Sequence, residues 1–321
     1  MFYLVQLLAD WLTYSVFDIT KETLLASSVN FFIFDTIKIF ILLAVIIFTV
    51  SIIRSFLPPE KIRMILSSEK KYFGNVLASL LGIITPFCTC SAIPLFIGFL
   101  EAGVPLGMTF SFLVASPMIN EVALVLLFGL FGWKIALLYI ASGLIIAILS
   151  GIIIGHLKVE KLVAEFIYKN RFNGQLQLPE MTWKQRVVYA KNYTIDIIKK
   201  VWIYIVIGIG VGAWIHGYVP TDLLVQYAGN GKWYAVPLVV LMGIPLYSSA
   251  AGIIPLVSVL TEKGVHLGTT LAFMMAVTAL SLPEFMILKK VMKVKLIVIF
   301  ASIVGLGIIF TGYLFNLVLK V

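Results

Sequence analysis

Two cysteines one residue apart are the side chains best suited to bind a soft solute. Cys88 and Cys90 lie in a segment that contains prolines, and Thr89 and Ser91 are their direct neighbours. Thiolates select thiophilic centres over hard cations, so we interpret these four residues as part of a binding site for such a solute. The alternative is that both cysteines are small buried hydrophobic residues, which is a common role for a free cysteine.

A glutamate inside an apolar segment is the second candidate for chemistry. Glu121 follows Ser116 and Asn120, and an acidic residue at the centre of a membrane helix costs about 2.5–3.5 kcal/mol or more on insertion scales. We therefore expect it to face the interior of a helix bundle, where it would exchange protons or pair with a cation. A protonated acid that only hydrogen-bonds a neighbouring helix is the alternative. With a gap of two residues Glu121 aligns with Glu284, which lies nearer a helix end.

The composition places these residues in a membrane protein. Of 321 residues, 61% are hydrophobic and 12% are charged, whereas a soluble domain has about 25% charged residues. This balance excludes a soluble enzyme and a nucleic-acid binder. Two cysteines are too few for a disulfide framework or a cysteine-rich zinc site, and neither a phosphate-binding loop nor a zinc-protease motif occurs. We expect no cofactor and no enzymatic activity.

Apolar segments of about 20 residues are long enough to cross a hydrocarbon core of about 30 Å. Two such segments, 73–100 and 233–261, are broken by prolines, and the second carries Ser248 and Ser249 where the first carries thiols. Broken backbone at membrane depth is tolerated only where protein or a water-filled cavity satisfies the freed groups. The uninterrupted segments are 33–56, 106–130, 133–156, 199–217, 266–288 and 295–319.

The two broken segments belong to an internal repeat. At an offset of 161 residues, ten identities fall within 94–115, among them Pro94, Glu101 and Gly103. We therefore predict repeats at 33–156 and 199–321. They would be joined by a cytoplasmic linker at 157–198 and preceded by an interfacial N-terminal helix at 1–32.

Basic residues predict how the repeats are oriented. Segments 54–71, 158–200 and 289–295 hold five, nine and four of the 24 Lys and Arg residues. All three should face the cytoplasm, so an even number of crossings must separate them. The broken segments then become re-entrant hairpins and the repeats become inverted. Simple kinked spans in parallel repeats are the alternative. We predict an all-α polytopic membrane protein of two inverted repeats, each with three transmembrane helices plus a broken or re-entrant helical hairpin.

Two long motifs resemble a known family. Residues 85–107 and 115–123 are similar to the bacterial and archaeal predicted permease family that includes the ArsP-type organoarsenical efflux permeases. The resemblance implies a multi-pass permease of the plasma (inner) membrane and, for some relatives, export of trivalent arsenicals. Carried onto this chain, the motifs point to Cys88, Cys90, Ser116, Pro117, Asn120 and Glu121.

The combined interpretation is a secondary transporter that exports a small solute, with a trivalent arsenical or another thiophilic compound as the candidate. Substrate-binding residues would be Cys88, Thr89, Cys90, Ser91, Ser116, Asn120, Glu121, Ser248, Ser249 and Glu284. Its partners would be the lipid bilayer and a small-molecule or metalloid substrate, and we expect no nucleic acid. Both a monomer and a homo-oligomer are compatible with the sequence. The alternative is an intramembrane thiol oxidoreductase that uses Cys88 and Cys90.

Overall fold

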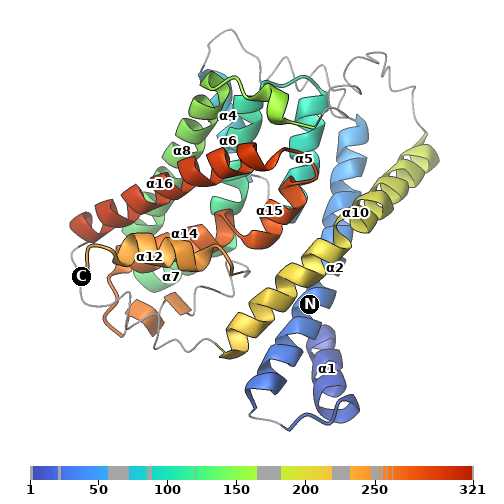
Figure 1. Ribbon diagram of the computed structural model, residues 1–321. Helices are drawn as coiled ribbons and strands as arrows, with labels where there is room; N and C mark the ends of the chain where they lie inside the picture. The colour runs from blue at the N-terminus through green and yellow to red at the C-terminus, as the bar shows by residue number, and fades with distance from the viewer. Residues whose placement is uncertain are drawn as a thin grey trace.

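The computed structural model describes most of the chain in several ranges. They are residues 3–20, 23–56, 72–84, 89–119, 121–164, 182–218, 232–246, 253, 256–257, 259–261 and 263–319. Each named element in these ranges is helical, which confirms the all-α prediction (Figure 1).

The described helices before the predicted linker are called the first half, and those after it the second half. The first half contains α1 (Tyr3–Trp11), the π-helical turn η1 (Leu12–Val16), α2 (Leu24–Phe56), α4 (Phe73–Ile84), α5 (Thr89–Glu101), α6 (Leu106–Met118), α7 (Glu121–Phe131) and α8 (Trp133–His156). A short 3₁₀ turn, η2 (Glu160–Leu162), follows. The second half contains α10 (Trp183–Tyr218), α12 (Ala235–Gly243), α14 (Leu267–Ala279), α15 (Leu282–Leu288) and α16 (Val294–Val318).

Four helices in the described ranges are long and apolar enough to cross a membrane, and a bent pair raises the number to five. The four are Leu24–Thr49, Trp133–His156, Leu267–Leu288 and Val294–Val318, while the pair Leu106–Met118 and Ala123–Phe131 bends by 49°. Most predicted spans are therefore found, but 106–130 is broken. The remaining predicted span, 199–217, lies inside α10 and is not among these candidates.

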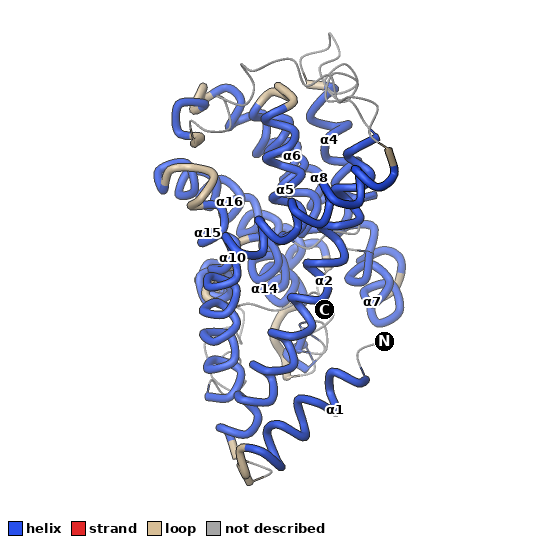
Figure 2. Tube along the Cα trace, turned by 90° about the vertical axis from the view of Figure 1, so that its right-hand side faces the viewer, coloured by secondary structure: helices blue, strands red, loops and turns tan. Residues whose placement is uncertain are grey.

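The N-terminal helix folds back on the first span. Gln6 Nε2 donates hydrogen bonds to Asp10 Oδ1 at 2.8 Å and to Asn30 Oδ1 at 3.1 Å, and Asn30 Nδ2 donates to Asp10 Oδ1 at 2.7 Å. These bonds tie α1 to α2. Because α2 begins at Leu24, residues 24–32 continue into a candidate span. Figures 1 and 2 place α1 at the end of the molecule away from α4.

Close glycine contacts in the first half recur 161 residues later. A Cβ atom on Gly107 would lie 2.5 Å from the Gly151 carbonyl oxygen, and one on Gly268 would lie 2.5 Å from that of Gly312. These contacts bring α6 against α8 and α14 against α16 with backbone touching backbone. Only glycine permits this approach, so the matched pairs explain why both halves keep the residue at these positions.

The first broken segment contains two helices, α4 and α5, that both pack against α6. Asn75, early in α4, donates a hydrogen bond to Ser111 at 2.9 Å, and Gly82, late in α4, approaches Phe112 and Ala115. Helix α4 therefore runs parallel to α6. Helix α5 returns to the start of α6 through a turn in which Gly103 has φ +82°. Both outer ends of the α4–α5 pair thus lie at the end of the bundle where α6 begins.

The segments next to the basic loops meet at that same end. The rings of Tyr72 and His156 stack with centroids 6.1 Å apart, which joins the start of α4 to the end of α8. Val163 forms an antiparallel bridge with Met292. Two 2.8 Å backbone hydrogen bonds flank the bridge, from Ala164 N–H to Val291 C=O and from Lys293 N–H to Leu162 C=O. We call this the basic end. Helix α8 ends there and α16 begins there.

Candidate functional site

The predicted site residues fall at helix starts and breaks. Thr89, Cys90 and Ser91 form the first turn of α5, and Glu121 is the first residue of α7. Cys88, Asn120, Ser248 and Ser249 lie outside the described residues. Ser116 and Glu284 are buried, each 2% exposed.

Ser116 lies where α6 packs against α4. A Cβ atom on Gly82 would lie 3.1 Å from the Ser116 backbone nitrogen, so the two helices approach closely at this residue. All residues of α6 are buried, including Pro117 next to the helix end. Ser116 therefore lies in the contact between α4 and α6, two residues before α6 ends.

The break after α6 is satisfied by a tyrosine from α8. Helix α6 ends at Met118, and the Tyr139 hydroxyl donates a 2.7 Å hydrogen bond to the Met118 carbonyl oxygen. Tyr139 is fully buried, and its hydroxyl lies near Thr278 of α14. The end of α6 is thus satisfied at a point close to the second half. This is the kind of protein partner that a broken helix needs at membrane depth.

The sequence interpretation did not include Tyr139 or Thr278. A tyrosine within an otherwise apolar span is the signal that could have identified the first, because a buried tyrosine hydroxyl usually finds a hydrogen-bond partner. No comparable signal marks Thr278. Its hydroxyl also bonds the carbonyls of Met274 and Met275 in its own helix at 3.0 and 3.1 Å.

The second break separates α14 from α15. Ser281 has an extended backbone with ψ 145° and precedes α15, and the Leu282 N–H donates a 2.9 Å hydrogen bond to the Ile244 carbonyl just after α12. Helix α15 packs against α5 and α10. Neither carboxylate oxygen of Glu284 has a hydrogen-bond partner among the described residues. The break therefore carries a buried acid that these residues leave unsatisfied.

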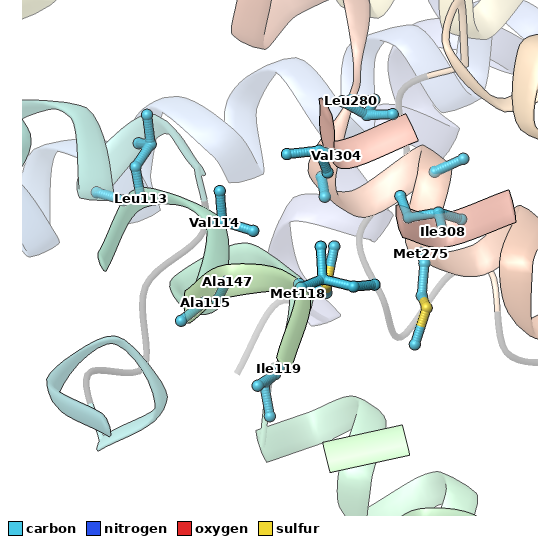
Figure 3. Close-up of a cluster of buried hydrophobic side chains, with 14 of the residues drawn as sticks. Leu113, Val114, Ala115, Met118, Ile119, Ala147, Met275, Leu280, Val304 and Ile308 are labelled. Atoms are coloured by element: carbon cyan, nitrogen blue, oxygen red, sulfur yellow. The ribbon is translucent and has the colours of Figure 1, made fainter. Parts of the chain in front are cut away.

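The two breaks meet in the core of the protein. Met118 and Ile119 at the end of α6 share a hydrophobic cluster with Leu280 at the end of α14 and with Val304 of α16 (Figure 3). Helices α6 and α14 also contact each other directly. We call residues 118–121 and 279–284 the central break region.

The offset of 161 residues continues through this region. Ile119 and Leu280 each donate their N–H to a carbonyl four residues earlier, at 2.9 Å in both cases. Helix α7 then begins at Glu121 and α15 at Leu282. Glu284 consequently lies two positions further along its helix than Glu121 does.

The polar groups of the region suit binding more than bond-breaking chemistry. Among the described side chains, those in or next to the region are the hydroxyls of Tyr139, Thr278 and Ser281 and the carboxyl group of Glu284. No group of three or more His, Cys, Asp or Glu residues that could hold a metal ion is found within the described ranges.

Comparisons with known proteins agree on a class of membrane protein. A Streptococcus mutans protein, whose name proposes it as a subunit of a two-component membrane permease complex, is 28% identical over 81% of this chain and 82% of its own length. A UPF0718 protein of Methanocaldococcus jannaschii is 21% identical over 79% of this chain and 85% of its own. The UPF0718 protein YcgR of Bacillus subtilis is 27% identical over 60% of this chain and 63% of its own. No solved structure matches the chain.

The family model described as "predicted permease" matches residues 24–317, which include every described helix from α2 to α15 and nearly all of α16. The match agrees with the resemblance seen in residues 85–107 and 115–123. The chain therefore belongs to the ArsP-type predicted permease family.

Proposed function

We propose that this permease is a secondary transporter that moves a small solute through the central break region. The observation that carries the proposal is the pair of helix breaks after α6 and α14, which occur at equivalent positions and meet in the core. Secondary transporters bind solutes at broken helices near the midplane, at the interface of internal repeats.

We further propose that the two repeats are inverted. Helices α8 and α16 are related by the 161-residue offset, yet α8 ends at the basic end and α16 begins there. Helices α2 and α10 are related by nearly the same offset and run in opposite directions in Figure 1. In agreement, Gly210 late in α10 lies close to Phe32 early in α2, since a Cβ atom on Gly210 would lie 3.7 Å from the Phe32 ring. With its lysines on the cytoplasmic face, the basic end would orient the protein in the plasma membrane.

The proposed substrate is a thiophilic solute, with a trivalent arsenical as the first candidate, and the proposed direction is export. Support comes from Cys90 at the start of α5, a helix that packs against α15 of the second half. Soft thiolate ligands suit trivalent arsenic better than they suit hard cations. Cys88, Ser116 and Glu121 would complete the solute-facing surface. Because the Streptococcus relative is named as a subunit of a two-component complex, we also propose that this permease works together with a second subunit.

Growth of cells with and without the gene tests the substrate. We expect expression to raise tolerance to methylarsenite, a trivalent compound, and to leave tolerance to arsenate unchanged, because arsenate does not bind thiols. A Cys88→Ser/Cys90→Ser double variant should lose the protection. Ser51→Ala is the matched control, since Ser51 is buried in α2 and bonds only the Ile47 carbonyl of its own helix.

Two results would contradict this proposal. If the wild type and the double variant give equal methylarsenite tolerance at equal protein level, Cys88 and Cys90 do not bind the solute. A Cys88–Cys90 disulfide that cycles with cellular redox state in thiol-trapping experiments would favour the oxidoreductase instead.

A further inference from the structure

Glu284 is a buried acid without a visible partner. Its side chain is 2% exposed, and among the described residues neither carboxylate oxygen accepts a hydrogen bond. An ionised carboxylate in such a place loses its hydration without compensation, which is among the largest penalties that a side chain meets. Ionisable residues inside membrane segments are rare for this reason and usually bind or relay ions.

The surroundings of Glu284 match a proton better than a metal ion. Hard cations need several oxygen ligands, about six to eight for Ca²⁺ and about six for Mg²⁺. The described residues provide no second oxygen that contacts the carboxylate and no cluster of three metal-ligating side chains. A proton neutralises the carboxylate without further ligands, so it is the cation that this site can hold.

The position of Glu284 connects it to both broken segments. The first residue of its helix, Leu282, hydrogen-bonds the Ile244 carbonyl next to α12, and α15 packs against α5. Glu284 also lies five residues before Lys289, which corresponds to about 7.5 Å along a helix towards the basic end. A movement of α15 relative to α5 and α12 would therefore change how well the carboxyl group is covered, and water from the basic end has a short distance to travel.

The titratable groups on the helices around α15 are few in α5, α12 and α14 and more numerous in α10. Helices α12 and α14 contain none, and α5 contains Cys90 and Glu101 at its two ends. Those of α10 are Lys184, Arg186, Tyr189, Lys191, Tyr193, Asp196, Lys199, Lys200, Tyr204, His216 and Tyr218. Neither carboxylate oxygen of Glu284 has a hydrogen-bond partner among the described residues, so no described cation compensates an ionised Glu284.

We propose that Glu284 binds the proton that is exchanged for solute, holding it as a carboxylic acid while covered and releasing it when a movement of α15 relative to α5 and α12 admits water. The inference rests on the proposed transport function and adds the coupling ion and its binding residue. It assigns this role to the second half, whereas Glu121 remains a candidate for solute contact.

Infrared spectroscopy of the purified full chain in liposomes tests the proton site without any substrate. The wild type should show the carbonyl band of a protonated carboxylic acid that is not hydrogen-bonded, and Glu284→Gln should lack it. Glu101→Gln is the matched control, because Glu101 lies at the α5–α6 turn and is only partly buried; it should keep the band. Identical bands in the wild type and Glu284→Gln would overturn the proposal.

Transport in the same liposomes tests coupling. With methylarsenite as the probe, an imposed pH gradient should drive uphill accumulation at least tenfold above the no-gradient level in the wild type and in Glu101→Gln. Glu284→Gln should lose this accumulation but retain exchange of internal for external methylarsenite, since its neutral amide mimics the protonated acid. Gradient-driven accumulation that is unchanged in Glu284→Gln would overturn the inference while leaving the transport function intact. If the wild type moves no methylarsenite, the proposed substrate fails and the infrared result alone decides the proton site.

Discussion

At the scale of single residues, Tyr139 shows how the protein accommodates a break inside its core. Helix α6 ends at Met118 and leaves a carbonyl group that no further turn of helix can satisfy. The Tyr139 hydroxyl supplies the donor, and the nearby Thr278 belongs to the other half. The equivalent position in the second half is Phe300, which has no hydroxyl. The two breaks are thus held differently, although their helices correspond.

Replacement of this hydroxyl gives a direct prediction. Tyr139→Phe should destabilise the protein by about 1–3 kcal/mol, because the buried Met118 carbonyl loses its donor while the ring still fills the same space. Thermal unfolding in detergent would measure the change. Tyr3→Phe is the control, since Tyr3 is 73% exposed and should show no shift. Equal unfolding temperatures for Tyr139→Phe and the wild type would show that water or another group replaces the hydroxyl.

At the scale of elements, paired glycines determine how closely the helices approach. Gly107 and Gly151 join α6 to α8, and Gly268 and Gly312 join α14 to α16. The atoms nearest to Gly107 and Gly268 include backbone carbonyl oxygens, which cannot move aside as a flexible side chain can. These contacts position α6 and α14, and hence the breaks that follow them.

Alanine at the paired glycines should therefore push the helices apart. Gly107→Ala and Gly268→Ala should each destabilise the protein by about 1–3 kcal/mol, the usual cost of overpacking. Gly129→Ala is the matched control, because a Cβ atom there meets nothing within 4 Å. That variant should be neutral or stabilising by about 0.5–1 kcal/mol, as expected for glycine to alanine within a helix. Denaturation of all three variants in one detergent provides the comparison, and equal effects at positions 107 and 129 would contradict the close approach.

At the scale of the whole molecule, the basic end joins the two halves. The Val163–Met292 bridge pairs a segment that follows α8 with one that precedes α16. Tyr72 and His156 bring the start of α4 to the same place. Lys158, Lys161, Lys289, Lys293 and Lys295 are exposed around this junction. Segments that are far apart in the chain thus present their positive charge together, as expected for one membrane face.

A designed disulfide tests this junction. In a chain without its native cysteines (Cys88→Ser/Cys90→Ser), Val163→Cys with Met292→Cys should crosslink under mild oxidation. Directly opposed residues of an antiparallel pair have Cα atoms about 4.5–5.5 Å apart, within the usual range for disulfides. Non-reducing electrophoresis after cleavage of the linker would detect the crosslink. Pairing Met292→Cys with Ser15→Cys is the control, since η1 follows α1 at the other end; crosslinking of both pairs, or of neither, would contradict the arrangement.

Much of this architecture could be predicted because it depends on periodic features of the chain. Apolar length predicted the helices, and recurring Pro94, Glu101 and Gly103 predicted the duplication. The helix bounds of α6 and α14 follow the same 161-residue offset. The clustering of the basic segments agrees with the charge pattern. Inversion of the repeats remains a proposal, and the thiol site remains a prediction because Cys88 lies outside the described residues.

The sequence by itself determined that the protein is a helical membrane permease with breaks inside two apolar segments, since chain length, hydropathy and motifs are properties of the order of residues. Only the tertiary structure showed the further breaks after α6 and α14, which lie inside segments that the sequence predicted to be uninterrupted, and which polar groups lie at them. Glu284, placed near a helix end by the sequence, is buried on a helix that packs against α5 and α10, and Tyr139 reaches a carbonyl group 21 residues away in the chain. The reason is that the burial of a side chain depends on which helices pack around it. Such packing brings together residues that are far apart in the chain, and no periodic pattern in the sequence reveals which ones they are.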